Sequence, residues 1–427
     1  MLFLLLCIYI SLYYIRPFEW SESLQGIPIF LSLGVISILA ILAALLSGKV
    51  KPFKYKTDAM MAGFVAAIAF SHLISGYVGG VVDSISNFLP SIVAYFLVVY
   101  GLDSKKKIHG FVFLLTVLTC FLAYEAYVQS VQGMTHGGML PYIQSQMGPD
   151  GLKIGIPRAR WFGPFNDPND LGLALVLPVA FLLERLLSRK YLLAALCLPL
   201  LLFGLYLTNS RGAMLSLLAS VFTFLVLRYR SMKGAVLGVA LAAVLLLLGP
   251  SRMEQLTGVD ESAYGRVEAW HEGFQMFKSS PLFGVGKDMF TEFHPITAHN
   301  TYMLVLAELG VFGLFFFIGL FYNSIIIGKM YLQGKLMPTE SDASEGMLCA
   351  ALGSLAGLMV AITFLSRAYI GTIYIMIAFA TVIASNFEQE AKSQEHSLNA
   401  NRRQIVPILG VVAFVIVGFN IAIKILI

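Results

Sequence analysis

Residues 27–56 read IPIFLSLGVISILAILAALLSGKVKPFKYK, an apolar run followed at once by a strongly basic segment. An α-helix needs about 20 apolar residues to cross the hydrocarbon layer of a membrane. Lys and Arg concentrate in the loops that stay on the cytoplasmic side. This stretch therefore predicts a membrane-spanning helix with a cytoplasmic loop after it, and the same pairing recurs along the chain.

The composition of the whole chain is typical of a membrane protein. Hydrophobic residues make up 58% of the 427 residues and charged residues only 12%, whereas a soluble domain carries about 25% charged residues. Basic loops account for the net charge of +5, which therefore does not indicate nucleic-acid binding. The four cysteines lie singly in apolar segments, a pattern that predicts neither disulfides nor a structural zinc site.

The apolar runs predict an all-α polytopic integral membrane protein with about 12–13 transmembrane helices. The runs lie at residues 2–15, 27–48, 58–77, 87–101, 109–130, 169–187, 191–208, 212–228, 234–249, 299–328, 346–366, 369–385 and 405–426. We divide the chain into N-terminal helices (1–130), a loop (131–168), helices at 169–249, a large loop (250–298), helices at 299–385, and a segment with the last helix (386–427). We expect the first run to be a retained span and not a cleaved signal peptide.

One orientation accounts for all the basic loops, because each follows an even-numbered span. These loops contain the basic residues at 49–56, 105–107, 185–190, 228–233, 329–335 and 402–403. The positive-inside rule places them, and the N-terminus, in the cytoplasm. The two long loops, 131–168 and 250–298, are then predicted to face the opposite, external side.

Several arginines lie on that external side, where the orientation rule does not explain them. They are Arg158, Arg160, Arg211, Arg266 and Arg367. A guanidinium offers a planar fork of donors that matches the oxygens of a phosphate. We therefore expect these residues to bind an anion at the external surface. An arginine that reaches from a helix end to a lipid headgroup is the plainer alternative, and for Arg211 alone the two explanations have equal weight.

His299 begins the apolar run 299–328, within Thr297-Ala298-His299-Asn300. We expect Thr297 to be the N-cap, which would place His299 and Asn300 in the first helical turn, where the helix dipole disfavours an imidazolium. A neutral imidazole at the membrane surface is the form that a general base needs. A histidine that only makes a hydrogen bond at a helix start is the plainer alternative.

Two more helix starts can be predicted from capping residues. Ser210 is a suitable N-cap for a helix that begins at Arg211, which would hold this arginine at the membrane surface. Asp167 is a suitable N-cap for a helix with Pro168 at its first position.

The large loop is predicted to contain an amphipathic helix that starts near Arg266, because Trp270 and other apolar residues recur after it at helical spacing. Proline and glycine at 281–286 predict a turn after that helix. Further along, Glu308 lies within an apolar run, where a carboxylate is costly, so we expect it to pair inside the protein.

Taken in order, these motifs resemble the O-antigen ligase family of polytopic bacterial proteins, which includes related polysaccharide polymerases and protein O-oligosaccharyltransferases. The resemblance covers about residues 150–385. It rests on FGPFNDPN (162–169), Ser210-Arg211-Gly212, Arg266 with Trp270, SPLFGVG (280–286), and His299-Asn300 followed nine residues later by GVFG (310–313). The last of these motifs is the most specific.

The resemblance implies a membrane glycosyltransferase of the second GT-C type in the bacterial inner membrane, with its active site facing the periplasm. The donor would be a glycan on undecaprenyl diphosphate, and the acceptor a hydroxyl on lipid A–core or on another glycan. It implies that His299 is the general base and that Arg211 and Arg266 bind the diphosphate. We also expect Asn300, Arg158, Arg160 and Arg367 to contact substrate.

The sequence contains no HExxH, DxD or Cys/His cluster, so we expect no metal and no cofactor. The resemblance therefore implies a metal-independent transfer, in which one base and one anion-binding group suffice for direct displacement with inversion at the anomeric carbon. O-antigen ligation to lipid A–core is the first reading, because the histidine motif is complete. An O-antigen or exopolysaccharide polymerase of the same family is the alternative. A polysaccharide transporter or flippase, and a non-catalytic assembly subunit, are the other two classes that the polytopic architecture allows.

Overall fold

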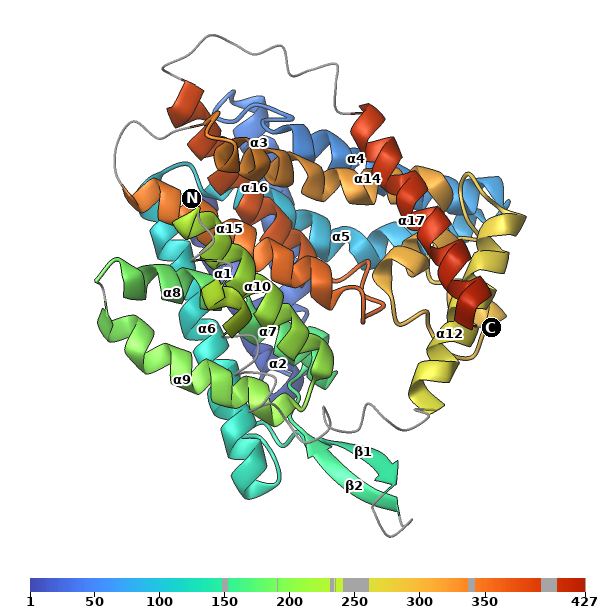
Figure 1. Cartoon of the computed structure of the whole chain (residues 1–427), viewed down its shortest axis with the longest axis horizontal. Helices are drawn as coiled ribbons and strands as arrows, with labels where there is room; N and C mark the ends of the chain where they lie inside the picture. Colours follow the sequence, from blue (N-terminus) through green and yellow to red (C-terminus); the bar gives the residue numbers. More distant parts are fainter. Residues whose placement is uncertain are drawn as a thin grey trace. The chain divides into compact units, whose positions relative to one another are not determined.

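The computed structural model describes residues 1–147, 153–189, 191–230, 234, 236–240, 261–336, 342–392 and 405–426. Within these residues, 11 helices are long and apolar enough to cross a membrane, and the strands form a single hairpin. The prediction of an all-α polytopic membrane protein is confirmed (Figure 1).

Two of the predicted spans account for the smaller number of helices. The run at 169–187 is broken into α7 (Pro168–Val176) and α8 (Val179–Leu187), with Pro178 at the junction. A proline has no backbone N–H and its ring clashes with the preceding turn, so a helix tends to break there. The run predicted at 234–249 lies outside the described residues beyond position 240.

The chain folds into two compact units, and each is built from separate stretches of the sequence. The first unit comprises Met1–Leu46, Phe96–Gln255 and Ser341–Ala361, and the second comprises Ser47–Tyr95, Leu256–Glu340 and Ile362–Ile427. The helix α5 (Val78–Gly101) contributes residues to both units.

In the first unit, α10 (Arg211–Tyr229) and α15 (Asp342–Ala361) form the most extensive helix pair. Ser216 Oγ donates a hydrogen bond of 2.8 Å to the Gly357 carbonyl across this interface. A Cβ at Gly353 would lie 2.8 Å from the Ser220 carbonyl oxygen, so the two backbones approach closely through glycine. Small residues allow such close approach between membrane helices.

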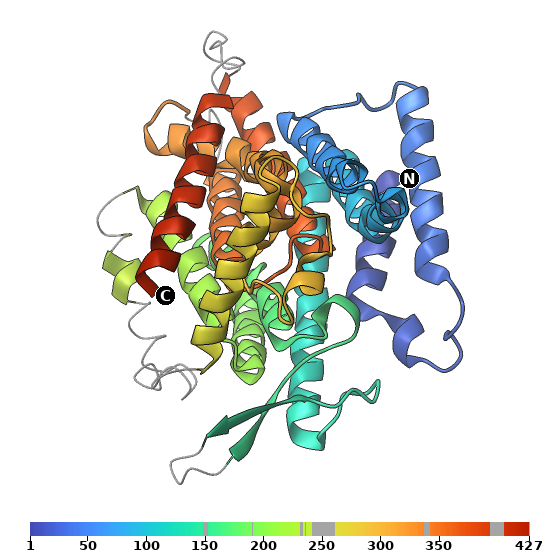
Figure 2. The ribbon, with the colours of Figure 1, turned by 90° about the vertical axis from the view of Figure 1, so that its right-hand side faces the viewer.

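The same unit contains α6 (Lys105–Gln132), which packs on α9 (Tyr191–Thr208). Its other elements are α1 (Leu2–Ile15), α2 (Pro17–Trp20), α3 (Ile29–Leu46), η1 (Gly163–Phe165), β1 (Tyr142–Met147) and β2 (Lys153–Arg158). The two strands pair antiparallel, with Tyr142 opposite Arg158. Figures 1 and 2 show this hairpin projecting from the unit near the C-terminal end of α6. The sequence prediction left these residues as loop.

The second unit is organised around the long helix α14 (Thr301–Leu332). It packs against α4 (Lys56–Ile74), α12 (Glu261–Ser279), α16 (Gly371–Lys392) and α17 (Ile405–Leu426). The short helix α13 (Phe290–Phe293) also contacts it. Helix α16 is the most enclosed of the candidate spans, because 89% of the residues in its most apolar stretch are buried. In α17 only 11% of the corresponding residues are buried, so most of this helix is exposed.

Candidate active site

Asn300 begins α14, and it does so as the N-cap. Its side-chain oxygen accepts hydrogen bonds from the backbone N–H groups of Tyr302 (3.0 Å) and Met303 (3.1 Å). The prediction that Thr297 is the N-cap is therefore wrong. Asparagine is the better cap, and from position 300 it reaches two of the N–H groups that have no partner within the helix.

His299 lies directly before this cap and not in the first turn. It is exposed, and its backbone is in the left-handed region with φ of 46°. Only a few per cent of residues other than glycine adopt this conformation, which costs energy and is found disproportionately at functional sites. The imidazole is thus presented outside the helix, next to its N-terminus.

Thr301 fastens a distant loop to the start of the helix. Its Oγ1 donates to the Leu365 carbonyl (2.5 Å) and accepts from the Arg367 backbone N–H (3.0 Å), and its own N–H donates to the Ile362 carbonyl (2.9 Å). Thr301 is completely buried. The Arg367 backbone is thereby bonded to a residue two positions from His299, although 68 positions of sequence separate Arg367 from His299.

The amphipathic helix predicted in the large loop is α12, and it is bonded to the other side of the same segment. The Trp270 indole N–H donates to the Ala298 carbonyl, one residue before His299, at 2.8 Å. Arg266 lies one turn earlier on the same helix, so it shares a face with Trp270. Trp270 therefore positions the histidine segment, in addition to packing on Phe419 with ring centroids 5.8 Å apart.

The predicted turn at 281–286, which we call the strap, is inserted into a break in α14. Gly310 has φ of 63° and ψ of −164°, so the helix is interrupted at this point. On one side of the break, Val311 and Phe312 donate to carbonyls of Pro281 (2.9 Å) and Leu282 (3.1 Å). The strap thus supplies acceptors for helix N–H groups that lie next to the interruption.

On the other side of the break, the strap residues donate to the helix. The N–H of Val285 donates to Ala307 (3.0 Å), and that of Gly286 donates to Glu308 (2.9 Å). A Cβ at Gly284 would lie 2.2 Å from the Glu308 carbonyl carbon, and one at Gly310 would lie 2.4 Å from that of Leu282. Both glycines are therefore required by a backbone-to-backbone contact.

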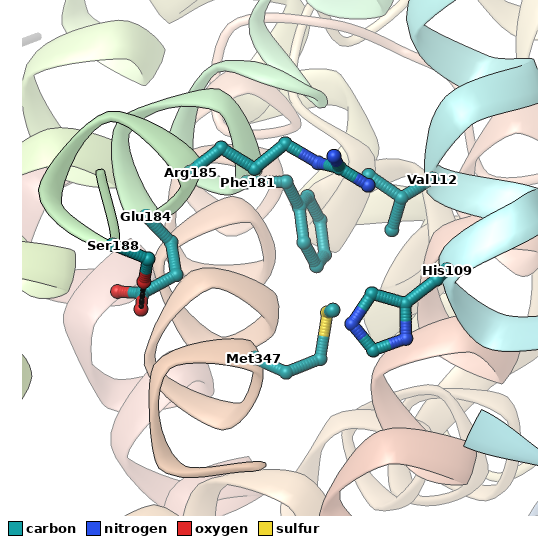
Figure 3. A pocket seen from close by; sticks show the side chains of 7 residues that line it. All are labelled: His109, Val112, Phe181, Glu184, Arg185, Ser188 and Met347. Carbon is teal, nitrogen blue, oxygen red and sulfur yellow. Dashed lines mark hydrogen bonds between the residues drawn. The ribbon is translucent and has the colours of Figure 1, made fainter. Parts of the chain in front are cut away.

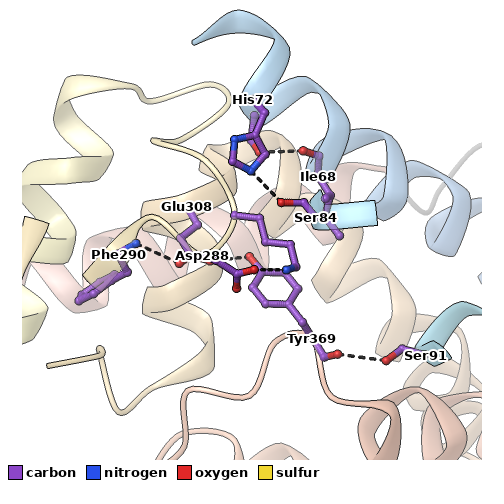
Figure 4. A network of polar contacts seen from close by, with 10 residues as sticks. Ile68, His72, Ser84, Ser91, Asp288, Phe290, Glu308 and Tyr369 are labelled. Atoms are coloured by element: carbon purple, nitrogen blue, oxygen red, sulfur yellow. Dashed lines mark hydrogen bonds and ion pairs between the residues drawn. The ribbon is translucent and has the colours of Figure 1, made fainter. Parts of the chain in front are cut away.

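Glu308 lies at this break and pairs inside the second unit, as predicted (Figure 4). Its carboxylate accepts from the Phe290 N–H (3.2 Å) and from the Tyr369 hydroxyl (2.7 Å). The Tyr369 carbonyl accepts in turn from Ser91 Oγ at 3.0 Å. Burial, reinforced by the Glu308 charge, raises the pKa of the Tyr369 phenol well above its ordinary value, so the phenol stays a donor. These bonds fix the loop two residues beyond Arg367.

Sequence reasoning missed a buried cation next to this group. Lys287 is only 3% exposed, forms an ion pair with Asp288, and places its ammonium 4.7 Å from the centre of the Tyr369 ring. Lys287 lies in the large loop that was predicted to be external, and it directly follows the glycine motif. Its position in the sequence could have identified Lys287 as a candidate, because the positive-inside rule does not explain a lysine in an external loop.

In the first unit, the predicted helix starts at Ser210 and Asp167 are both confirmed. Ser210 Oγ accepts from the Ala213 N–H at 3.2 Å, and Asp167 accepts from the Asn169 N–H at 2.8 Å. Ser210 Oγ also donates to Asn169 Oδ1 at 2.6 Å, which joins the two helix starts. Arg211 is the first residue of α10 and is half-buried.

Arg158 braces this junction. Its three guanidinium nitrogens each donate a hydrogen bond of 2.9 Å, to the Thr208 carbonyl, Gln144 Oε1 and Asn169 Oδ1. Arg158 is 7% exposed. These contacts favour a role in holding the turn before Arg211 over direct contact with a substrate.

Arg160 is also held by the protein around it. Its Nε donates to the Leu140 carbonyl (3.0 Å) and its Nη1 to Asn166 Oδ1 (3.1 Å), while its backbone N–H donates to Gln129 Oε1 (3.0 Å). Arg160 thus ties the loop after α6 to the loop before α7.

The second unit therefore brings together the segments that carry Arg266, His299 and Arg367, while Arg158, Arg160 and Arg211 belong to the first unit. Within the described ranges, no group of three His, Cys, Asp or Glu side chains is arranged to hold a metal ion. The second unit therefore presents an exposed imidazole, with arginines on the segments bonded to it. This arrangement is suited to removing a proton next to a bound anion.

Residues 195–318 match the family model described as O-antigen ligase. The matched region includes Arg211, Arg266 and His299, together with the strap and the glycine break at Gly310. Among curated proteins, no sequence matches the chain.

Proposed function

We propose that this chain, whose residues 195–318 match the O-antigen ligase family model, transfers a glycan from undecaprenyl diphosphate to the hydroxyl of an acceptor. The chain is a multi-pass membrane protein. The proposed acceptor is lipid A–core, and the proposed location of the reaction is the periplasmic face of the bacterial inner membrane. No metal or cofactor takes part in the proposed reaction.

The observation that carries this proposal is the set of hydrogen bonds around residues 298–301. Trp270 binds the Ala298 carbonyl, and Thr301 binds the loop of Arg367. His299 is exposed between these two anchors, in a strained backbone conformation that the anchors help to maintain. A fixed histidine with arginines on both adjoining segments supports transfer from a diphosphate-linked donor.

In the proposed reaction, His299 removes the proton from the acceptor hydroxyl as its oxygen attacks the anomeric carbon. A new C–O bond forms, the bond from that carbon to the diphosphate oxygen breaks, and the electron pair stays on the diphosphate. The guanidinium group of Arg266 stabilises the charge on the leaving group, and the family resemblance implies the same role for Arg211. Direct displacement inverts the anomeric carbon. General base catalysis of this kind typically contributes about 10²–10⁴-fold to the rate.

The test uses a strain that lacks this gene, complemented with wild type, His299→Ala or His271→Ala at matched membrane levels. His271 is a suitable control because it lies on α12, where its ring bonds Gln275 of the same helix at 3.1 Å. We expect His299→Ala to abolish most transfer and His271→Ala to retain it. Full activity of the His299→Ala strain would contradict the general-base role.

The same strains separate the ligase from the polymerase, because gels resolve surface lipopolysaccharide and carrier-linked glycan. Long glycan that accumulates on the carrier, together with bare lipid A–core, supports a ligase. Single repeat units on the carrier support a polymerase. Purified protein that transfers a supplied donor glycan would exclude transport as the sole function.

A further inference from the structure

A small cavity lies in the first unit near the N-terminal end of α6 (Figure 3). Its volume is ≈ 40 Å³, and it is lined by His109, Val112, Phe181, Glu184, Arg185, Ser188 and Met347. Helix α6 has 28 residues and is therefore about 42 Å long. Gln129, which binds the backbone of Arg160, lies near its other end. The cavity and the Arg158–Arg160 region thus lie at opposite ends of this candidate span.

Arg185 brings to the cavity a positive charge that pairs with no carboxylate of the described residues. Figure 3 shows its guanidinium extended over the Phe181 ring toward Val112, away from Glu184. Across the part of the chain that the structure describes, the Arg185 side chain makes no hydrogen bond or ion pair. A half-buried guanidinium in apolar surroundings is costly unless an anion or water satisfies it.

Glu184 does not supply that anion, because other groups already bind it. Its carboxylate lies 3.2 Å from Arg228 Nε and accepts a hydrogen bond of 2.7 Å from Ser188 Oγ. A Cβ at Gly346 would lie 2.0 Å from Glu184 Oε1, so the carboxylate is pressed against the backbone of α15. The Glu184 charge is thus neutralised by Arg228, and within the described ranges no carboxylate is left to neutralise Arg185.

The rest of the lining combines one polar group with apolar walls. His109 Nδ1 donates to the Lys105 carbonyl at 2.8 Å, so Nε2 is the remaining polar atom of its ring. Phe181, Val112 and Met347, from three different helices, form the apolar walls. A water needs about 10–15 Å³ of such volume, so the cavity has room for a cluster of a few oxygen atoms and is too small for a sugar ring.

We propose that this cavity binds the phosphate of an anionic phospholipid, with Arg185 and His109 facing the phosphate oxygens. Arginine is well suited to phosphate because its fork of donors matches two oxygens at once. The predicted topology puts this end of α6 at the cytoplasmic surface, where anionic headgroups are found. The proposal does not depend on the transfer reaction.

The chain offers a matched control for the experiment. Arg189 lies one turn beyond Arg185, is exposed, and does not line the cavity. Arg185→Gln and Arg189→Gln remove the same charge at the same membrane surface. The purified proteins, in neutral detergent, are titrated with phosphatidylglycerol, phosphatidylcholine or inorganic phosphate, and the shift in Tm is measured.

We expect phosphatidylglycerol to raise the Tm of wild type and of Arg189→Gln, and Arg185→Gln to need about tenfold more of this lipid, as the loss of one charged hydrogen bond implies. Equal losses in both variants, or an equal response to phosphatidylcholine, would indicate general attraction between helix ends and headgroups and would overturn the proposal. Inorganic phosphate that acts as strongly as the lipid would show a free-phosphate site and would overturn the lipid assignment.

If Arg185→Gln does not fold, Arg185→Lys keeps the charge and loses the planar fork. We expect it to respond to phosphatidylglycerol more weakly than wild type. A response equal to that of wild type, with Arg189→Gln also unaffected, would contradict binding of the phosphate by the guanidinium.

Discussion

Asn300 shows how a single residue combines capping with a place in the candidate site. Its side chain satisfies two N–H groups of α14, and its neighbour His299 is exposed in a left-handed conformation. The sequence analysis predicted Thr297 as the cap and placed Asn300 in the first turn. Because Asn300 and not Thr297 is the cap, His299 lies outside the helix. Its imidazole can therefore approach a substrate from a different direction than a residue in the first helical turn could.

The two roles of Asn300 can be separated by two substitutions. Asn300→Ala removes the cap and should cost about 1 kcal/mol of stability, whereas Asn300→Asp keeps an oxygen that accepts the same bonds. We expect Asn300→Asp to retain the Tm of wild type but to transfer glycan more slowly if the amide also contacts the substrate. Tm and transfer rate are measured on the same preparations. Wild-type activity in Asn300→Asp would show that Asn300 acts only as a cap.

At the scale of elements, the strap explains why two glycine motifs far apart in the sequence occur together. Residues 281–286 take over backbone hydrogen bonds on both sides of the break at Gly310. Next to this break, the Glu308 carboxylate accepts a hydrogen bond from the Tyr369 hydroxyl. This bond fixes the loop that carries Arg367. The strap is therefore part of the support for the candidate active site.

Gly310→Ala tests this interlock. The new Cβ would lie 2.4 Å from the Leu282 carbonyl carbon, and the backbone at Gly310, with φ of 63° and ψ of −164°, has a conformation that costs about 1–3 kcal/mol for a residue with a side chain. We expect a marked fall in Tm and in membrane level. Gly418→Ala in α17 is the control, because a Cβ there meets no atom within 4 Å. Similar Tm values for the two variants would argue against a tight strap.

At the scale of the whole molecule, the first unit makes the predicted orientation testable. The hairpin follows the C-terminal end of α6, whereas Lys106 is in its first turn. Ser145 and Lys106 are both exposed, so cysteines placed there can react with a maleimide.

We expect a membrane-impermeant maleimide to label Ser145→Cys in right-side-out spheroplasts, and to label Lys106→Cys only after permeabilisation. The parent protein, which has four cysteines of its own, provides the background. Labelling of Lys106→Cys alone in intact spheroplasts would reverse the proposed topology.

The sequence by itself determined the features that depend on neighbouring residues. Apolar runs predicted most of the spans because crossing a membrane demands length and composition, which any one segment displays. The caps at Ser210 and Asp167 were predictable because they satisfy N–H groups two or three positions away. The pairing of Glu308 inside the protein followed from the cost of an unpaired carboxylate in an apolar run.

Only the tertiary structure decided which distant segments meet. The bond from the Arg367 N–H to Thr301, the Trp270 bond to Ala298 and the strap in the break at Gly310 join residues far apart in the sequence. Their geometry depends on how whole helices pack, and no local pattern contains that information. The same holds for Arg158, whose three acceptors converge from separate segments and favour a bracing role over the predicted contact with substrate.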